Sequence, residues 1–258
     1  MFAWLKRRRR DAVRRQPFPV EWRRFIDKNV PFVARLPPDD RQELGGHILV
    51  FLAEKHFEGC GGLELTDEVR VTIAAQACIL LLHRDTDDYP NLVSILVYPT
   101  TYVVRGGRRT ADGLIAEGPE ARLGESWARD VVVLAWDSVL SGAADIHDGH
   151  NVVLHEFAHQ LDQESRADTG VPVLPRRSMY LAWARVLGHD FDQLVHDVAH
   201  HHRTLIDRYG ATNPAEFFAV VTETFFEKPR PLRAKHPELY GLLKEFYRQD
   251  PAELAPKA

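Results

Sequence analysis

The sequence has few cysteines, the residues whose disulfides cross-link small or secreted folds. Its 258 residues include two cysteines, Cys60 and Cys78, whose spacing fits neither a disulfide framework nor a CxxC metal knuckle. We therefore expect two free thiols, Cys60 in a Gly-rich turn and Cys78 in a helix. A hydrophobic fraction of 45% is ordinary for a globular chain with a sizeable core, so the fold does not need disulfide cross-links.

Long apolar runs are also absent. The longest run is centred on Ile79–Leu82, far short of the roughly 20 residues that a membrane-spanning helix needs. A signal peptide is not expected either, because the basic residues 7–10 are followed by Asp-Ala-Val-Arg-Arg instead of an apolar stretch of about 7–15 residues. We therefore expect a cytoplasmic protein without a transmembrane segment.

A local excess of charge of one sign occurs at the N-terminus, and the chain as a whole has no large excess. The formal net charge of −4 gives no reason to expect specific nucleic-acid binding. Lysine and arginine nevertheless dominate the first fifteen residues, which contain the single acid Asp11. Such a segment suits a mobile arm that contacts anionic lipid or nucleic acid, although a solvated, disordered tail is the simpler interpretation. We therefore predict a basic flexible arm at residues 1–16 and a single domain at residues 17–258.

Hydrophobic spacing and turn residues predict a mixed first half and a mainly helical second half. The predicted elements are a helix from Pro38 to near Gly59, a short strand at 63–65, a helix from Thr66 to about His83, and β-rich stretches at 92–104 and 131–135. A turn-like segment at 105–113 separates the β-rich stretches, and the pattern is helical from Asn151 onward. Without repeats or low-complexity linkers, this organisation indicates one α+β unit with a small sheet.

The chain has no Gly-rich phosphate loop and no serine nucleophile elbow, but it contains the segment His155-Glu156-Phe157-Ala158-His159. Residues four apart share one face of a helix, so His155 and His159 can bind one metal ion beside Glu156. The opposite face is apolar, with Leu154, Phe157 and Leu161. Two imidazoles with one carboxylate form a catalytic zinc site, in which Glu156 would be the general base.

The third ligand is less clear from the residues alone. A metzincin would place Gly at position 162 and His at position 165, but this chain has Asp162 and Ser165, which excludes that arrangement. A later carboxylate is the better candidate, and Glu216 and Glu223 lie seven apart on one stripe of a predicted helix. Asp162 is either a residue that orients His159 or a solvated helix residue.

Two structural interpretations compete with a ligand at Glu216. Asn213, Pro214 and Glu216 resemble the start of a helix with a capping box. Alternatively, Glu216, Glu223 and Glu227 form a solvated acidic face. The residues alone leave these alternatives open.

Tyr209 and a histidine cluster are the remaining candidates. Tyr209 can donate a hydrogen bond to the oxyanion of a peptidase, or simply pack in the core. His196, His200, His201 and His202 suggest a second metal site, since His196 and His200 are four apart. No carboxylate partner follows the pattern, so we favour an exposed, histidine-rich helix.

Four stretches of the chain point to a known family: residues 59–65, 71–78, 149–162 and 215–220. Through them the chain, from roughly Phe18 to Tyr247, resembles the Mlc titration factor A family of bacterial zinc-dependent peptidases. In that family the third zinc ligand is a glutamate that follows a tyrosine by seven residues. The resemblance therefore implies the ligands His155, His159 and Glu216, with Glu156 and Tyr209 as catalytic residues.

The resemblance also carries expectations about fold and partners. It implies a gluzincin-type core with an active-site layout like that of anthrax lethal factor, bound Zn2+, and an aminopeptidase-like activity on peptide substrates. It further implies binding of the glucose-responsive transcriptional repressor Mlc, which links the family to sugar uptake. The alternative function is a non-catalytic cytosolic regulator that sequesters this repressor.

Overall fold

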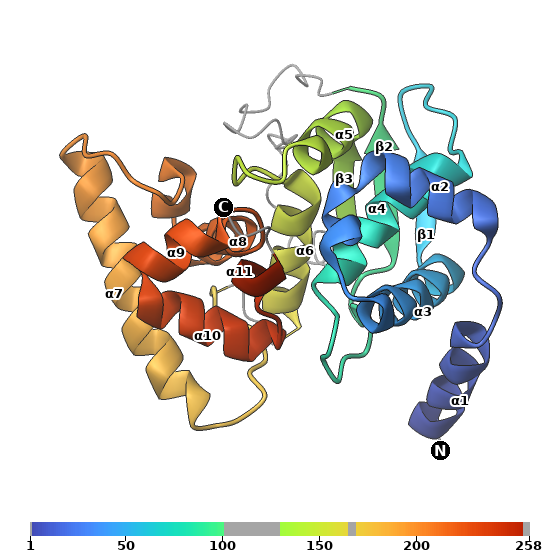
Figure 1. Cartoon of the computed structure of the whole chain (residues 1–258), viewed down its shortest axis with the longest axis horizontal. Coiled ribbons are helices and arrows are strands. Elements are labelled where there is room, and N and C mark those ends of the chain that lie inside the picture. Colours follow the sequence, from blue (N-terminus) through green and yellow to red (C-terminus); the bar gives the residue numbers. More distant parts are fainter. Residues whose placement is uncertain (1, 101–129, 165–168, 255–258) are drawn as a thin grey trace, which may run out of the picture.

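The computed structural model describes residues 2–100, 130–164 and 169–254. The first half comprises α1 (Phe2–Arg14), α2 (Val20–Asn29), η1 (Pro31–Arg35), α3 (Pro38–Glu54), β1 (His56–Gly59), α4 (Asp67–Ile79), β2 (Ser94–Tyr98), β3 (Val131–Ala135) and α5 (Trp136–Ala144). The second half comprises α6 (Val152–Gln163), α7 (Met179–Ala199), η2 (Arg208–Ala211), α8 (Pro214–Glu227), α9 (Pro229–Lys235), α10 (Pro237–Tyr247) and α11 (Pro251–Leu254). In Figure 1, α6 lies between these two halves. The predicted α+β class, with a mixed first half and a helical second half, is confirmed.

The described residues of the first half form a small sheet of three strands, in the order β1-β2-β3. Both pairs are parallel, with His56 opposite Ser94 and Ser94 opposite Val131. Parallel neighbours need a crossover connection, and α4 lies in the connection between β1 and β2. The β-rich stretch at 131–135 is confirmed as β3, whereas the turn-like segment 105–113 lies outside the described residues.

The first strand precedes the Gly-rich turn instead of following it. The prediction of a strand at 63–65 is wrong, because those residues form no strand and β1 spans His56–Gly59. The helix α3 ends at Glu54, and Lys55 adopts the extended conformation that starts the strand. Phe57 is the one large apolar residue of β1, so the strand is too short and too polar to show a clear alternation.

The helix α4 occupies the centre of the first half. Its predicted start is confirmed, since the Thr66 hydroxyl caps it by accepting the backbone N–H of Val69 at 3.3 Å. It packs against α2, α3 and α6, and its residues from Val71 to Ile79 are buried on nearly every side. It ends at Ile79, before the predicted boundary near His83, and turns follow.

The chain begins with a helix, which differs from the flexible arm expected for residues 1–16. Arg10 of α1 is 5% exposed, and its guanidinium forms ion pairs with Glu54 of α3 and with Asp87. Arg14 donates to the buried carboxylate of Asp88 at 3.1 Å. These acids neutralise one face of a basic segment, and α1 packs on α3 at the edge of the molecule (Figure 1).

The state of the two cysteines and the length of the helices can be compared with what the sequence predicts. Cys60 is partly exposed and Cys78 of α4 is buried, and both are free thiols as expected. None of the helices in the described part of the chain has both the length and the apolar character to cross a bilayer.

Candidate metal centre

The helix α6 carries the HExxH segment and is fixed at its N-terminus by a side-chain cap. The carbonyl oxygen of the Asn151 side chain accepts the backbone N–H groups of Val153 and Leu154 at 3.1 and 3.0 Å. The predicted apolar face is confirmed, because Leu154, Phe157 and Leu161 are at most 3% exposed. Packing of this face against the core leaves the histidines on the other side of the helix.

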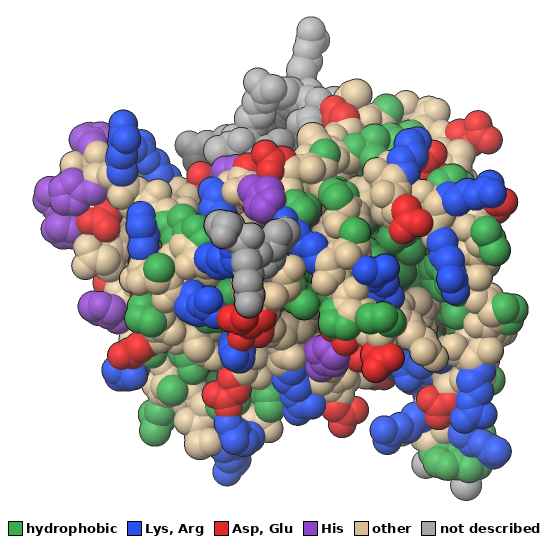
Figure 2. Space-filling view, viewed as in Figure 1, with side chains coloured by type: hydrophobic (Ala, Val, Ile, Leu, Met, Phe, Trp, Pro, Cys, Tyr) green, Lys and Arg blue, Asp and Glu red, His purple; other side chains and the backbone are tan. Residues whose placement is uncertain are grey.

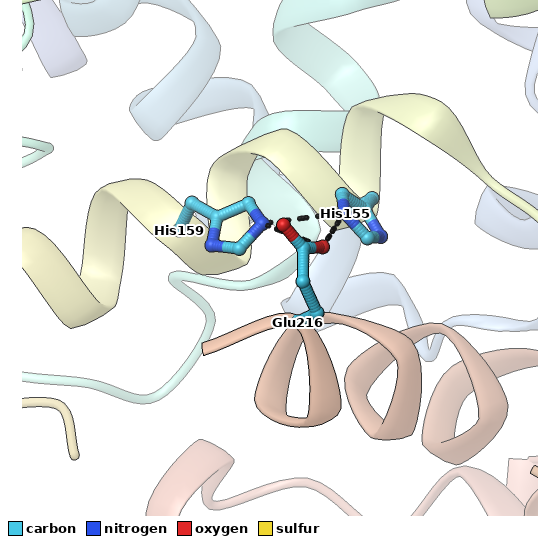
Figure 3. A group of neighbouring side chains, drawn as sticks. All are labelled: His155, His159 and Glu216. Carbon is cyan, nitrogen blue, oxygen red and sulfur yellow. Dashed lines mark hydrogen bonds and ion pairs between the residues drawn. The ribbon is translucent and has the colours of Figure 1, made fainter. Parts of the chain in front are cut away.

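Figure 3 shows His155 and His159 of α6 with Glu216 of α8 pointing to one spot. His155 Nε2 lies 3.2 Å from His159 Nε2, and Glu216 Oε2 lies 3.0 and 3.4 Å from these two atoms. Ligands about 2.0–2.1 Å from a tetrahedral zinc ion are about 3.3 Å apart. The three atoms therefore have the separations of three corners of such a site.

In its neutral form, the His155 ring directs a lone pair toward this triangle. Its Nδ1 lies 2.8 Å from Glu223 Oε1, and a carboxylate oxygen accepts, so Nδ1 carries the proton in the neutral ring. The Nε2 atom then has a bare lone pair that faces the carboxylate of Glu216. Lone pairs this close repel unless a cation lies among them, which a metal ion would supply.

The shifts in pKa show the same demand for positive charge. Burial alone would lower the pKa of His155, but hydrogen bonds with Glu216 and Glu223 outweigh burial and raise it well above its usual value. Burial likewise opposes ionisation of Glu216, yet its contacts with His155 and His159 lower the pKa of that carboxyl to about 2. The site is therefore built around a charged carboxylate and a positive charge.

The helix α8 resolves the alternatives for its acidic residues. Asn213 does cap the helix, since its side-chain oxygen accepts the backbone N–H of Glu216 at 3.0 Å. The Glu216 carboxylate, however, turns to the histidines and does not complete a capping box. Glu223 and Glu227 are 6% and 2% exposed, so the interpretation as a solvated acidic face is wrong for both. Burial, together with the nearby charge of Asp148, raises the pKa of Glu227 to about 9.

The two predicted catalytic residues lie next to the proposed ligands. Glu156 is on α6 between the two histidines, and burial raises the pKa of its carboxyl. Tyr209 lies in η2, and its ring centre is 5.9 Å from that of His155. Its backbone N–H donates to Asp207 Oδ1 at 2.8 Å, which fixes the start of this short helix.

Asp162 is fully buried, so its interpretation as a solvated helix residue is wrong. Its Oδ2 accepts the backbone N–H of Gly170 at 2.6 Å. Gly170 in turn accepts the indole N–H of Trp183 through its carbonyl at 3.0 Å. Asp162 thus ties the end of α6 to the segment that leads into α7.

Two adjoining cavities lie on the side of His155 that faces Glu223. His155 and Glu223 line one of about 410 Å³. A second cavity of about 320 Å³ shares His150 and Asp207 with the first. His159 and Glu216 line neither cavity, so both cavities lie on the Nδ1 side of His155, away from the triangle of proposed ligand atoms.

Comparisons with known proteins agree with the geometry. Residues 3–248 match the family described as glucose-regulated metallo-peptidase M90, so the match begins before Phe18, where we expected it to start. An uncharacterized protein of Synechocystis is 44% identical over 96% of this chain and 90% of its own length. Proteins named Mlc titration factor A from Pectobacterium atrosepticum and Serratia proteamaculans are each 32% identical over 86% of this chain, and over 84% and 85% of their own lengths.

Proposed function

We propose that this chain, which belongs to the glucose-regulated metallo-peptidase M90 family, is a zinc-dependent, aminopeptidase-like enzyme that acts in the cytoplasm. The observation that supports this proposal is the triangle of His155 Nε2, His159 Nε2 and Glu216 Oε2, with sides of 3.0 to 3.4 Å. Family membership gives the class, a metallopeptidase. The resemblance supports the aminopeptidase-like activity.

Zinc is the ion that best fits these donors. Imidazole nitrogens and a carboxylate oxygen suit Zn2+, and three protein ligands leave one position open, as in catalytic sites. Bound zinc would supply a Lewis acid for the scissile carbonyl and would acidify the attacking water. Asn151 and Glu223 hold the helix and the ring that present these ligands, so the site is built in advance of binding.

The chain's own residues supply the proton transfers. We assign Glu156 the role of general base, which takes a proton from the attacking water and delivers it to the leaving amine. Its raised pKa suits a group that must both accept and release a proton. Tyr209, beside His155, would donate its phenolic hydrogen to the oxygen of the scissile carbonyl as charge develops there.

The Glu156→Gln variant tests the mechanism. The zinc content should stay near one ion per chain, because Glu156 is not one of the proposed ligands, while hydrolysis of amino-acid and short peptide anilides should fall by about 10²- to 10⁴-fold. Zinc is measured by mass spectrometry and hydrolysis by release of the chromophore. Undiminished turnover in a zinc-loaded variant would refute Glu156 as the base.

A second candidate function is regulation by binding a transcriptional repressor. It is supported by relatives named Mlc titration factor A, among them those of Pectobacterium atrosepticum and Serratia proteamaculans. In this case the chain would bind an Mlc-like repressor in the cytoplasm, with hydrolysis secondary or vestigial.

The zinc-loaded Glu156→Gln form also separates these two functions. A binding protein should retain a purified Mlc-like repressor of its host, intact, with an affinity equal to that of the wild type. Failure of both forms to bind the repressor, together with cleavage of anilides by the wild type alone, would leave the peptidase function.

A further inference from the structure

Histidines gather at one tip of the molecule, where α7 ends, away from the proposed catalytic centre. Figure 2 shows this cluster in purple at the end of the helix labelled α7 in Figure 1. His196 and His202 are exposed, with 57% and 58% of their side-chain surface accessible, and Asp197 lies between them at 25%. The sequence interpretation found no carboxylate partner for these histidines, but the fold supplies Asp197.

The chain reversal after α7 explains how His202 reaches Asp197. The backbone N–H of His202 donates to the carbonyl of Asp197 at 2.9 Å, and that of His201 donates to Val198 at 3.2 Å. These two bonds, with His201 at φ 57°, form a Schellman motif, in which the residue with positive φ is most often glycine. The motif returns the chain over the last turn and brings His202 to the face of Asp197.

The side chains of the cluster are already close enough to share an ion. Asp197 Oδ1 lies 3.0 Å from His202 Nδ1 and 3.6 Å from His196 Nδ1. These separations lie on either side of the roughly 3.3 Å expected between two ligands of a tetrahedral zinc ion. Single ligand atoms from all three residues lie within 4.8 Å of one another.

His200 adds a fourth nitrogen next to this group. Its Nδ1 lies 2.7 Å from the carbonyl oxygen of His196, which can only accept, so Nδ1 carries the proton and Nε2 has the lone pair in the neutral ring. Its ring stacks on that of His196 with 4.1 Å between centres. Its ring centre is also 5.8 Å from that of His202, so the His200 imidazole lies beside two members of the group.

We infer that His196, Asp197 and His202 form a second, surface binding site for a divalent transition metal such as Zn2+ or Ni2+, with His200 as an auxiliary ligand. Imidazole donors favour these ions over Mg2+ and Ca2+, which prefer oxygen ligands. The negative end of the α7 dipole, in a helix of 21 residues, also favours a cation at this tip. The inference does not rest on the proposed peptidase function.

Metal binding here would close a short chelate between the last turn of α7 and the segment that follows it. That segment, residues 203–207, leads directly into η2, and η2 packs against α7. The bound metal would therefore link the end of α7 to the segment that leads into η2, which contains Tyr209. The exposed position makes binding weaker than at the buried triangle around His155.

The test is isothermal titration calorimetry of the full-length, zinc-loaded protein. Zn2+ and Ni2+ are titrated in separate experiments. We expect one additional equivalent beyond the zinc already bound. The His196→Ala and His202→Ala variants should bind this equivalent at least about 10-fold more weakly, because each loses one of three ligands. Since both side chains are exposed, circular dichroism should show unchanged folding.

Matched controls decide whether the assigned ligands are responsible. His201→Gly removes a histidine from the same tip at a position whose positive φ favours glycine, and His189→Ala removes an exposed histidine of the same helix. Both variants should keep the additional equivalent. Glu216→Gln should lose the first zinc but retain the second, which separates this inference from the proposed function. No additional equivalent in the wild type, or an equal loss in the control variants, would overturn the inference.

Discussion

The carboxylate of Glu223 lies 2.8 Å from Nδ1 of His155, on the opposite side of the imidazole from Glu216. Its other oxygen accepts the backbone N–H of Asn151 at 2.6 Å. Glu223 therefore joins the start of α6 to the orientation and tautomer of a proposed ligand. Such carboxylate–histidine pairs behind a metal fix the ring and increase its basicity.

This arrangement predicts different effects for the two glutamates. Glu223→Gln has one acceptor oxygen for two N–H partners, so the His155 ring or the Asn151 backbone loses a bond, and zinc affinity should fall by about 10- to 100-fold. Glu216→Gln removes a charged ligand and should cause the larger loss. Competition with a zinc-binding dye measures both affinities, and the reverse ranking would reassign the third ligand to Glu223.

The ion pairs of α1 predict a contribution of the N-terminus to stability. Arg10→Ala leaves Glu54 and the buried Asp88 with less positive charge, and Asp87 without one partner. The free energy of unfolding should fall by about 2 to 4 kcal/mol, below the upper values for fully buried pairs because Asp87 is half exposed. Urea denaturation measures the change.

The neighbouring Arg9 is an exposed, matched control. Arg9→Ala should change the free energy of unfolding by less than about 0.5 kcal/mol. Both variants should retain zinc, because the residues of the proposed centre lie outside α1. Equal stability of the two variants would mean that the ion pairs of Arg10 contribute nothing and that residues 1–16 behave as the flexible arm first expected.

Local signals in the sequence were sufficient for the helices that carry the centre. Asn151 and Asn213 each precede a helix and each caps it, so the starts of α6 and α8 follow from short-range chemistry. The spacing of His155 and His159 places both on one face by helical geometry alone. The seven-residue spacing of Glu216 and Glu223 likewise placed both on one stripe.

Tertiary contacts decide what the spacing leaves open. Glu216 and Glu223 lie on the same stripe of α8, so the spacing does not distinguish them. Their contacts differ because the His155 ring lies between them, with Nε2 facing Glu216 and Nδ1 facing Glu223. The ion pairs of Arg10 join residues more than 40 positions apart, so they cannot be inferred from the local sequence. For this reason the local sequence predicts a flexible arm, although the basic segment folds as α1. The return of His202 to Asp197 depends on a positive φ at His201, which histidine rarely adopts.

A buried histidine in the first half predicts a pH dependence of stability. His47 is 6% exposed, and its Nδ1 lies 2.7 Å from Asp88 Oδ1. Burial and the nearby Arg14 lower its pKa, but hydrogen bonds with Asp88 and Glu43 outweigh them, and the folded pKa is raised. Protonated His47 therefore stabilises the fold below its unfolded pKa of about 6.5, and this stabilisation is lost as pH rises through the higher folded pKa.

The His47→Gln variant tests this dependence. The difference in free energy of unfolding between wild type and variant should be largest near pH 6 and should shrink as pH increases. Urea denaturation at several pH values measures it, and the exposed His189→Gln variant should follow the wild type. A difference that grows with pH would show that His47 is held neutral in the folded protein.

Tyr209→Phe tests the proposed oxyanion donor with the smallest change in shape. The ring keeps its packing 5.9 Å from that of His155, and the hydroxyl alone is lost. If that hydroxyl stabilises charge that develops only in the transition state, kcat should fall by about 10²- to 10³-fold while KM and zinc content change little. A purely structural tyrosine would instead lower the thermal stability and leave kcat nearly unchanged. Steady-state kinetics with zinc-loaded protein, together with a melting curve, therefore distinguish catalysis from packing at this residue.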